Sequence, residues 1–163
     1  MAPHRLTSMQ DGEDKPGIST RRAPPAFRAV QVGDTACGRG VFTRIALRSG
    51  QLVAEIRGVV IDDPSYESDY CMDLDDGTTL EPTAPFCYLN HSCDANCAWF
   101  VSWGPADGRR AVVPSVWLEA LDDIEAGSEL TIDYGWPDIA PIACRCASPH
   151  CRGWVVAGTP QRN

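Results

Sequence analysis

Residues 90–96, NHSCDAN, stand out from the short apolar runs around them, because an amide, an imidazole, a hydroxyl, a thiol and a carboxylate follow one another there. A hydrolase triad does not explain the stretch, since His91 is followed directly by Ser92, which is too close in sequence to be its usual partner. The other histidines offer no substitute. His4 belongs to the polar beginning of the chain, and His150 lies beside Cys151, where we expect it to be a bystander. The stretch therefore needs a different chemical interpretation.

The C-terminal cysteines form the clearest chemical motif. Cys144, Cys146 and Cys151 have a C-x-C-x4-C spacing that places three thiolates within reach of one ion. Zinc takes four ligands in a tetrahedron, so a fourth ligand has to come from elsewhere, and both Cys93 and Cys97 are available. The chain begins without a secretory h-region, and in a reducing compartment clustered thiols hold metal more often than they form disulfides.

Composition narrows the class of protein. The chain has 163 residues and a formal net charge of -8, from 14 Lys+Arg against 22 Asp+Glu. This acidity disfavours direct binding to nucleic acid and favours a cationic partner. No apolar run approaches the ~20 residues of a membrane span. We therefore expect an intracellular protein, cytoplasmic or, in a eukaryote, nuclear, without a membrane partner.

Short β-like runs separated by turn residues predict a mostly β domain. Asp75, Asp76 and Gly77 lie between two of these runs and predict a hairpin. Helical periodicity is limited to one or two turns within residues 83–89 or 137–142. The expected strands are residues 28–32, 40–44, 51–56, 59–61, 69–74, 78–80, 110–121 and 129–132.

Four motifs in order carry a resemblance to a known family: residues 38–42 (GRGVF), 90–96 (NHSCDAN), 129–135 (ELTIDYG) and 144–154, the cysteine segment. Together they resemble the SET-domain protein lysine methyltransferases. The resemblance implies a β-clip of short strands with few short helices, in which the second and third motifs thread past one another like a knot. It also implies a flexible arm over residues 1–26, a SET domain over 27–136 and a post-SET zinc-binding segment over 137–163.

The resemblance assigns roles to single residues. Tyr134 corresponds to the family's catalytic tyrosine. Cys93 would join Cys144, Cys146 and Cys151 around one structural zinc ion. Trp154 would pack against the adenine of S-adenosylmethionine. The residues implied to bind that cofactor are Gly38, Arg39, Gly40, Asn90, His91, Tyr134 and Trp154.

The implied activity is methyl transfer from S-adenosylmethionine to the ε-amine of lysine in a basic, possibly histone-like protein or peptide. Two alternatives remain open at this stage. One is a related enzyme that acts on a small amine or on the cofactor itself. The other is a non-catalytic, zinc-stabilised interaction domain, since a fold alone does not determine function. The sequence does not indicate the oligomeric state.

The chain departs from the family pattern mainly on the substrate side. Ile56 stands where the family often has a tyrosine, and Tyr66 or Tyr70 are candidates to replace its hydroxyl. Ile132, two residues before Tyr134, replaces a frequent aromatic residue and predicts room for more than one methyl group. Two further differences from the signature are Cys87 and Ala95.

Overall fold

The structure is a computed structural model that describes residues 29–104, 114–136, 138 and 141–156. The expected arm over residues 1–26 lies outside this range, as does the beginning of the strand expected at 110–121. Half of the expected helical turn at 137–142 falls on residues that are not described, and its last residue, Ile142, is in a strand. Among the described residues no helix is long and apolar enough to cross a membrane.

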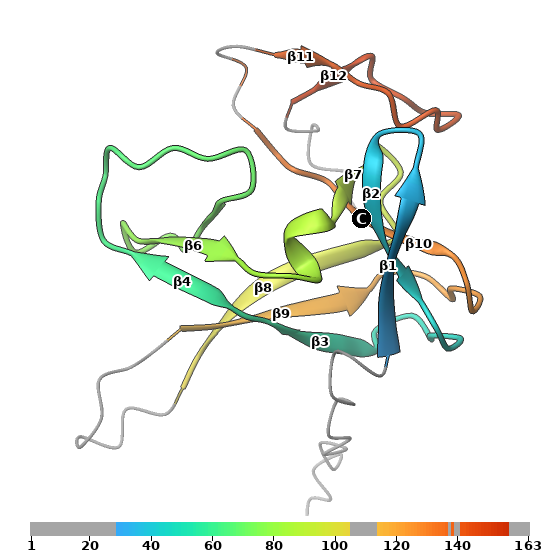
Figure 1. The fold of residues 1–163 in the computed structure, drawn as a ribbon, viewed down its shortest axis with the longest axis horizontal. Helices are drawn as coiled ribbons and strands as arrows, with labels where there is room; N and C mark the ends of the chain where they lie inside the picture. Colours follow the sequence, from blue (N-terminus) through green and yellow to red (C-terminus); the bar gives the residue numbers. More distant parts are fainter. Residues whose placement is uncertain (1–28, 105–113, 137, 139–140, 157–163) are drawn as a thin grey trace, which may run out of the picture.

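The mostly β architecture expected from the sequence is confirmed (Figure 1). One 3-10 turn, η1 (Phe86–Tyr88), falls within the expected helical stretch at 83–89. In chain order the strands are β1 (Val30–Thr35), β2 (Gly38–Thr43), β3 (Leu52–Ile56), β4 (Gly58–Ile61), β5 (Met72–Asp73), β6 (Thr79–Pro82), β7 (Asn90–His91), β8 (Cys97–Trp103), β9 (Pro114–Ala120), β10 (Glu129–Ile132), β11 (Ile142–Ala143) and β12 (Trp154–Val155).

These strands form small sheets with the orders β1-β2-β10-β7, β3-β9-β8 and β4-β6-β5, and the pair β11-β12. In Figure 1 the sheet of β3, β9 and β8 runs across the middle of the molecule. The pair β4 and β6 lies to its left, and β1 and β2 lie to its right. The expected hairpin at residues 75–77 joins β5 to β6, with Asp75 and Gly77 at φ 60 and 87. That positive φ is accessible to glycine and tolerated by aspartate.

Alternation of buried and accessible side chains explains why the runs form strands. In β9 the side chains of Val116, Leu118 and Ala120 are buried, and the residues between them are only partly buried. One face of the strand thus packs into the core, as period-two patterning requires. Leu118 and Leu130 are fully buried at 0% exposure, so the core lies between the sheets that carry β9 and β10.

Candidate functional site

The two signature segments, residues 90–96 and 129–135, lie side by side. Strand β7 pairs in parallel with β10, with Asn90 opposite Thr131 and His91 opposite Ile132. The side chain of Asn96 adds two bonds, since its Oδ1 accepts from the Thr131 N–H at 2.9 Å and its Nδ2 donates to the Glu129 carbonyl at 2.8 Å. The Asn96 amide thus bonds the backbone of β10 as a neighbouring strand would, and this stabilises the short parallel pair.

The glycine turn joins this pair through Asn90. The Asn90 Nδ2 donates to the carbonyl of Arg39 at 3.0 Å and to Glu129 Oε1 at 2.7 Å. A Cβ on Gly40 would lie 2.6 Å from Glu129 Oε1 and 3.1 Å from Asn90 Nδ2, so only glycine allows this approach. Gly38, at φ +110, has open space beside it. Gly38, Arg39, Gly40 and Asn90 therefore form one continuous cradle of backbone and amide groups.

Arg39 contributes its backbone to the cradle, while its side chain points elsewhere. The guanidinium donates to the Tyr88 hydroxyl at 2.9 Å and lies 4.6 Å from the centre of the Tyr88 ring. This cation–π contact and hydrogen bond hold the turn against η1, the short helix that precedes the first signature segment.

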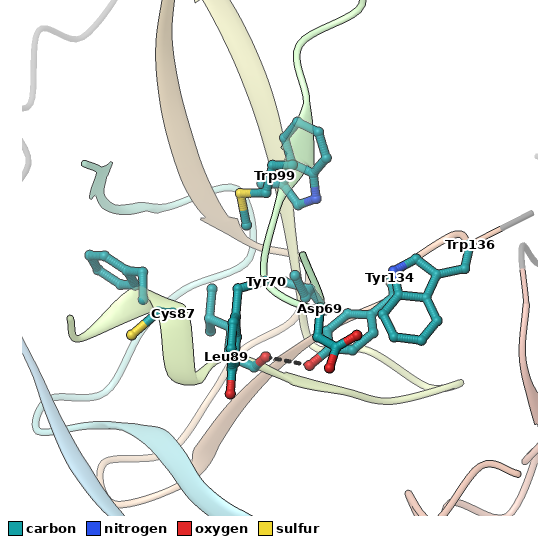
Figure 2. Close-up of a pocket in the computed structure, with 10 residues that line it drawn as sticks. Asp69, Tyr70, Cys87, Leu89, Trp99, Tyr134 and Trp136 are labelled. Carbon is teal, nitrogen blue, oxygen red and sulfur yellow. Dashed lines mark hydrogen bonds between the residues drawn. The ribbon is translucent and has the colours of Figure 1, made fainter. Parts of the chain in front are cut away.

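Tyr134 lines a pocket, and its hydroxyl donates to the Leu89 carbonyl at 2.8 Å (Figure 2). Burial raises the pKa of Tyr134 to about 12, and Tyr70 and nearby acidic groups add to the effect. The phenol is consequently neutral at physiological pH, with its proton directed at Leu89. Its oxygen can then accept a hydrogen bond from a group that enters the pocket.

The pocket is narrow and largely aromatic. Its cavity volume is about 40 Å³, space for a few water-sized groups and far too little for a nucleotide. Figure 2 shows Trp136 beside Tyr134, and their ring centres are 5.1 Å apart. The lining residues are Asp69, Tyr70, Met72, Phe86, Cys87, Leu89, Trp99, Ile132, Tyr134 and Trp136.

Of the two tyrosines considered as replacements on the substrate side, Tyr70 lines the pocket. Tyr66 does not line it, and its hydroxyl donates to Glu81 at 3.2 Å. Ile56 is a core residue at 2% exposure, opposite Val116 in the β3–β9 pair. Ile132 and Cys87, both departures from the family pattern, line the pocket.

Sequence reasoning did not identify the two tryptophans of the pocket, Trp99 and Trp136. Each follows a signature segment within three residues of its end, and this proximity is the signal that the sequence contains. Asp69 was missed because it lies far from either segment, in the connection between β4 and β5.

The structure brings four cysteines together. The sulfur atoms of Cys93, Cys144, Cys146 and Cys151 all lie within 4.8 Å of one another, and Cys93 Sγ is 3.7 Å from Cys144 Sγ. Zinc–sulfur bonds of about 2.3 Å in a tetrahedron place the sulfurs about 3.8 Å apart, so the set fits a structural zinc ion. Cys97, the other candidate, is buried in the core at 1% exposure.

His91 lies between the cysteine cluster and Tyr134. Its Nδ1 accepts from the Tyr134 N–H at 3.2 Å, and its Nε2 lies 3.4 Å from Cys93 Sγ. Burial lowers the pKa of His91, which favours the neutral ring, and an accepting Nδ1 places the remaining proton on Nε2. The imidazole can therefore donate to the Cys93 sulfur, as an outer partner of a metal ligand commonly does.

The remaining expected residues belong to the segment of residues 144–154, called here the knuckle. His150 is outside the cysteine cluster, and its Nδ1 lies 2.9 Å from Asp94 Oδ2. Trp154 is on β12 and 52% exposed, so its ring is available for a further contact.

The domain is mostly β and pairs its two signature segments. It also has a pocket lined by a neutral tyrosine and a cluster of four cysteines. These features together were expected from the resemblance to SET-domain proteins. A profile of the SET domain matches residues 38–135. The chain belongs to the SET-domain family, as the sequence motifs predicted.

Named relatives agree with this assignment. The "Histone-lysine N-methyltransferase, H3 lysine-4 specific" of Saccharomyces cerevisiae is 30% identical over 149 residues, which cover 86% of this chain and 13% of the relative. The "H3 lysine-36 specific" enzyme of Homo sapiens is 30% identical over 160 residues, which cover 85% of this chain and 5% of the relative. The chain thus matches a small part of much longer proteins.

Solved structures show the same fold. KRYPTONITE in complex with mCHG DNA and SAH matches with a TM-score of 0.66 at 23% identity, over 77% of this chain and 28% of that one. KRYPTONITE with mCHH DNA, an H3(1-15) peptide and SAH matches with a TM-score of 0.62 at 26% identity, over 77% of this chain and 29% of that one.

Proposed function

We propose that the chain is an S-adenosylmethionine-dependent protein-lysine N-methyltransferase with Tyr134 as its catalytic residue. The observation that carries the proposal is the small pocket that Tyr134 lines, together with the bond of the Tyr134 hydroxyl to the carbonyl of Leu89, the residue before Asn90 of the cradle. The names of the relatives in two organisms support the same reaction class.

The pocket suits a lysine side chain on physical grounds. A lysine has to lose its proton before the amine can act as a nucleophile, and at neutral pH this costs about 4–5 kcal/mol from an ordinary pKa of ~10.4. The aromatic residues of the pocket reduce that cost because they partly desolvate the ammonium form. Tyr134 is neutral and donates to Leu89, so it orients the amine as an acceptor and does not take the proton, which leaves for solvent.

The cofactor would be held on the other side of the signature segments. S-adenosylmethionine supplies an activated methyl group on a sulfonium sulfur. Gly38, Arg39 and Gly40 would bind its amino-acid end through the backbone, with Asn90 beside them. His91 would bind toward the adenine through its main chain, and Trp154, which is exposed on β12, would cover that ring.

The surroundings of the pocket favour a basic protein substrate. No Lys or Arg occurs between Arg57 and Arg109, whereas Asp62, Asp63, Glu67 and Asp69 fall in the connection between β4 and β5. Asp69 lines the pocket, so the end of this acidic connection borders it. A lysine flanked by other basic residues, as in a histone tail, would be attracted there. The proposal therefore includes a nuclear location in a eukaryotic cell, and the acidity of the chain argues against direct binding to DNA.

The same proposal divides the chain into an arm over residues 1–26, a SET domain over 27–136 and a zinc-binding post-SET segment over 137–163. Cys93 belongs to the SET domain but would ligate the zinc of the post-SET segment. The metal would thus connect the two parts covalently in the folded state.

A labelling experiment tests the activity. Zinc-replete protein is incubated with methyl-labelled S-adenosylmethionine and either histone H3, a soluble cell extract or a mixture of small amines, and labelled proteins are separated from labelled small molecules. We expect label in protein and a loss of at least about 100-fold with Tyr134→Phe, the usual cost of removing an oriented hydrogen-bonding group from an active site. Affinity for S-adenosylhomocysteine should change less than about twofold.

Tyr66→Phe is the matched control, because it removes the same hydroxyl from a residue outside the pocket and should leave the rate nearly unchanged. Label found only in small amines would replace the proposal with the metabolite enzyme. Failure of the zinc-loaded protein to bind S-adenosylhomocysteine would favour the non-catalytic interaction domain.

A further inference from the structure

Arg152 connects the knuckle to the segment that carries Tyr134. One of its terminal nitrogens donates to Asp133 Oδ1 and to the Val156 carbonyl, both at 2.8 Å. The Arg152 side chain is 25% exposed and that of Asp133 is 35% exposed. A charge-assisted hydrogen bond that is shielded to this extent is stronger than one on an open surface.

The same residue contacts the cysteine cluster. The Arg152 backbone N–H donates to Cys93 Sγ at 3.3 Å. The Arg152 Nε is buried and has no hydrogen-bond acceptor among the described residues, so the hydrogen-bonding capacity of the guanidinium is only partly used.

The charge of the metal site gives a further reason for an arginine at this position. Four thiolates outweigh the two positive charges of a zinc ion, and the resulting site is net negative. Arg152 directly follows the ligand Cys151, and its guanidinium is fixed on the Asp133 carboxylate, so this positive charge belongs to the segment that would hold the metal.

Asp133 passes the connection on to the catalytic segment. Asp133 immediately precedes Tyr134, and its Oδ1 accepts from the Gly135 N–H at 3.3 Å as well as from Arg152. The carboxylate therefore links Arg152 to the backbone on the far side of Tyr134. The knuckle also contacts the first signature segment through Cys93, whereas the contact of His150 with Asp94 is much weaker because the His150 side chain is 82% exposed.

We propose that Arg152 is a positioning residue that couples the metal site to the catalytic segment: it compensates the charge of the cysteine cluster and, through Asp133, holds the backbone of Tyr134 in place. The coupling to catalysis rests on the proposed function, whereas the stabilisation of the metal does not.

Release of zinc tests the first part. Zinc-loaded protein is mixed with a chromogenic chelator, and the rate of metal transfer is followed for wild type, Arg152→Gln, Arg152→Lys and Arg145→Gln. We expect Arg152→Gln to release zinc at least about 10-fold faster, the usual effect of losing an outer partner of a metal ligand. Arg145→Gln removes the same charge from an exposed position between two ligands and should stay within about twofold of wild type. Arg152→Lys keeps the charge and should retain most of the metal affinity. Equal release from Arg152→Gln and Arg145→Gln would overturn the proposal.

The second part needs a signal from the catalytic segment that does not depend on turnover. Trp136 packs on Tyr134, so its indole N–H resonance, assigned with Trp136→Phe, reports on that segment. We expect removal of zinc to shift this resonance in wild type and in Arg145→Gln, and to shift it clearly less in Asp133→Asn, where the connection through Arg152 is lost and only the route from Cys93 through His91 to the Tyr134 N–H remains. A shift of the same size in Asp133→Asn would overturn the coupling. Because both readouts need no substrate, they stand even if no methyl transfer is found.

Discussion

The fourth metal ligand can be tested by exchanging two cysteines that are only four positions apart. Cys93 lies in the cysteine cluster with its sulfur 3.7 Å from that of Cys144, whereas Cys97 is buried in the core at 1% exposure. We expect Cys93→Ser to reduce bound zinc below one ion per chain, and Cys97→Ser to leave the metal content unchanged.

The two substitutions should also differ in their effect on stability. Structural zinc contributes on the order of 10–16 kcal/mol of apparent binding free energy at neutral pH, so loss of a ligand should remove much of the stability of the knuckle. Cys97→Ser places a hydroxyl in the core at a cost of about 1–3 kcal/mol. That corresponds to a fall in Tm of roughly 2–4 °C for each kcal/mol in a chain of this size.

The assay combines metal analysis by mass spectrometry with thermal unfolding in buffer with and without a chelator. Cys97→Ser should have a lower Tm that still falls further when zinc is removed, while the Tm of Cys93→Ser should respond little to the chelator. Full zinc content in Cys93→Ser, together with loss of zinc from Cys97→Ser, would refute the assignment of the ligand set.

Three further predictions concern the pocket. Ile132 lines the pocket and is smaller than an aromatic residue, so wild type should transfer more than one methyl group. In peptide mass spectrometry, Ile132→Phe should shift the products toward monomethyl-lysine, and an unchanged product ratio would contradict this. Asp69→Asn should raise KM for a basic peptide several-fold at low salt and less at high salt, because a surface charge contributes about 0.2–1 kcal/mol and is screened. The control is Asp122→Asn, which removes the same charge from an exposed residue outside the acidic connection. The folded-state pKa of Tyr134 is raised from 10.0 to about 12, so its contribution to stability is complete below pH 10 and is lost as the pH rises toward 12. Tyr134→Phe should flatten that alkaline loss in chemical denaturation, and an identical pH dependence would argue against the buried phenol.

Local pattern predicted the strands better than it predicted their partners. The runs at 51–56, 59–61 and 129–132 were recognised because side-chain burial alternates or β-branched residues cluster, and both are local properties. Strand β8 was missed although it contains Trp99, Phe100 and Val101. Beyond Cys97 its residues are partly buried or exposed, so no clear alternation with buried residues marks the strand. The parallel pairing of β7 with β10 joins residues about forty positions apart and could be expected only from the family resemblance.

The cofactor and metal residues were found from the sequence because each is part of a motif with its own spacing. The residues on the substrate side have no such spacing. The lining of the pocket comes from loops and strands spread over residues 69–136, and each side chain faces it only because of tertiary packing. The substitution of Ile56 for the family's frequent tyrosine suggested a missing hydroxyl, yet Ile56 faces the core and Tyr70 brings a phenol to the pocket from the β4–β5 connection.

That replacement has a consequence for specificity. Tyr70 is 55% exposed and lies outside any regular strand, whereas Tyr134 is held by the β10 segment and by its bond to Leu89. Tyr134 is therefore tied to Leu89, whereas Tyr70 belongs to a connection that also carries the acidic residues Asp62, Asp63, Glu67 and Asp69. Under the proposed function, a basic peptide that binds this connection would fix the position of Tyr70 and so complete the pocket. The residues around the target lysine would then affect the rate of methyl transfer as well as the affinity for the peptide. A free amine has no flanking charges with which to do this. The arrangement thus favours a protein substrate over a metabolite for a physical reason that is independent of the relatives' names.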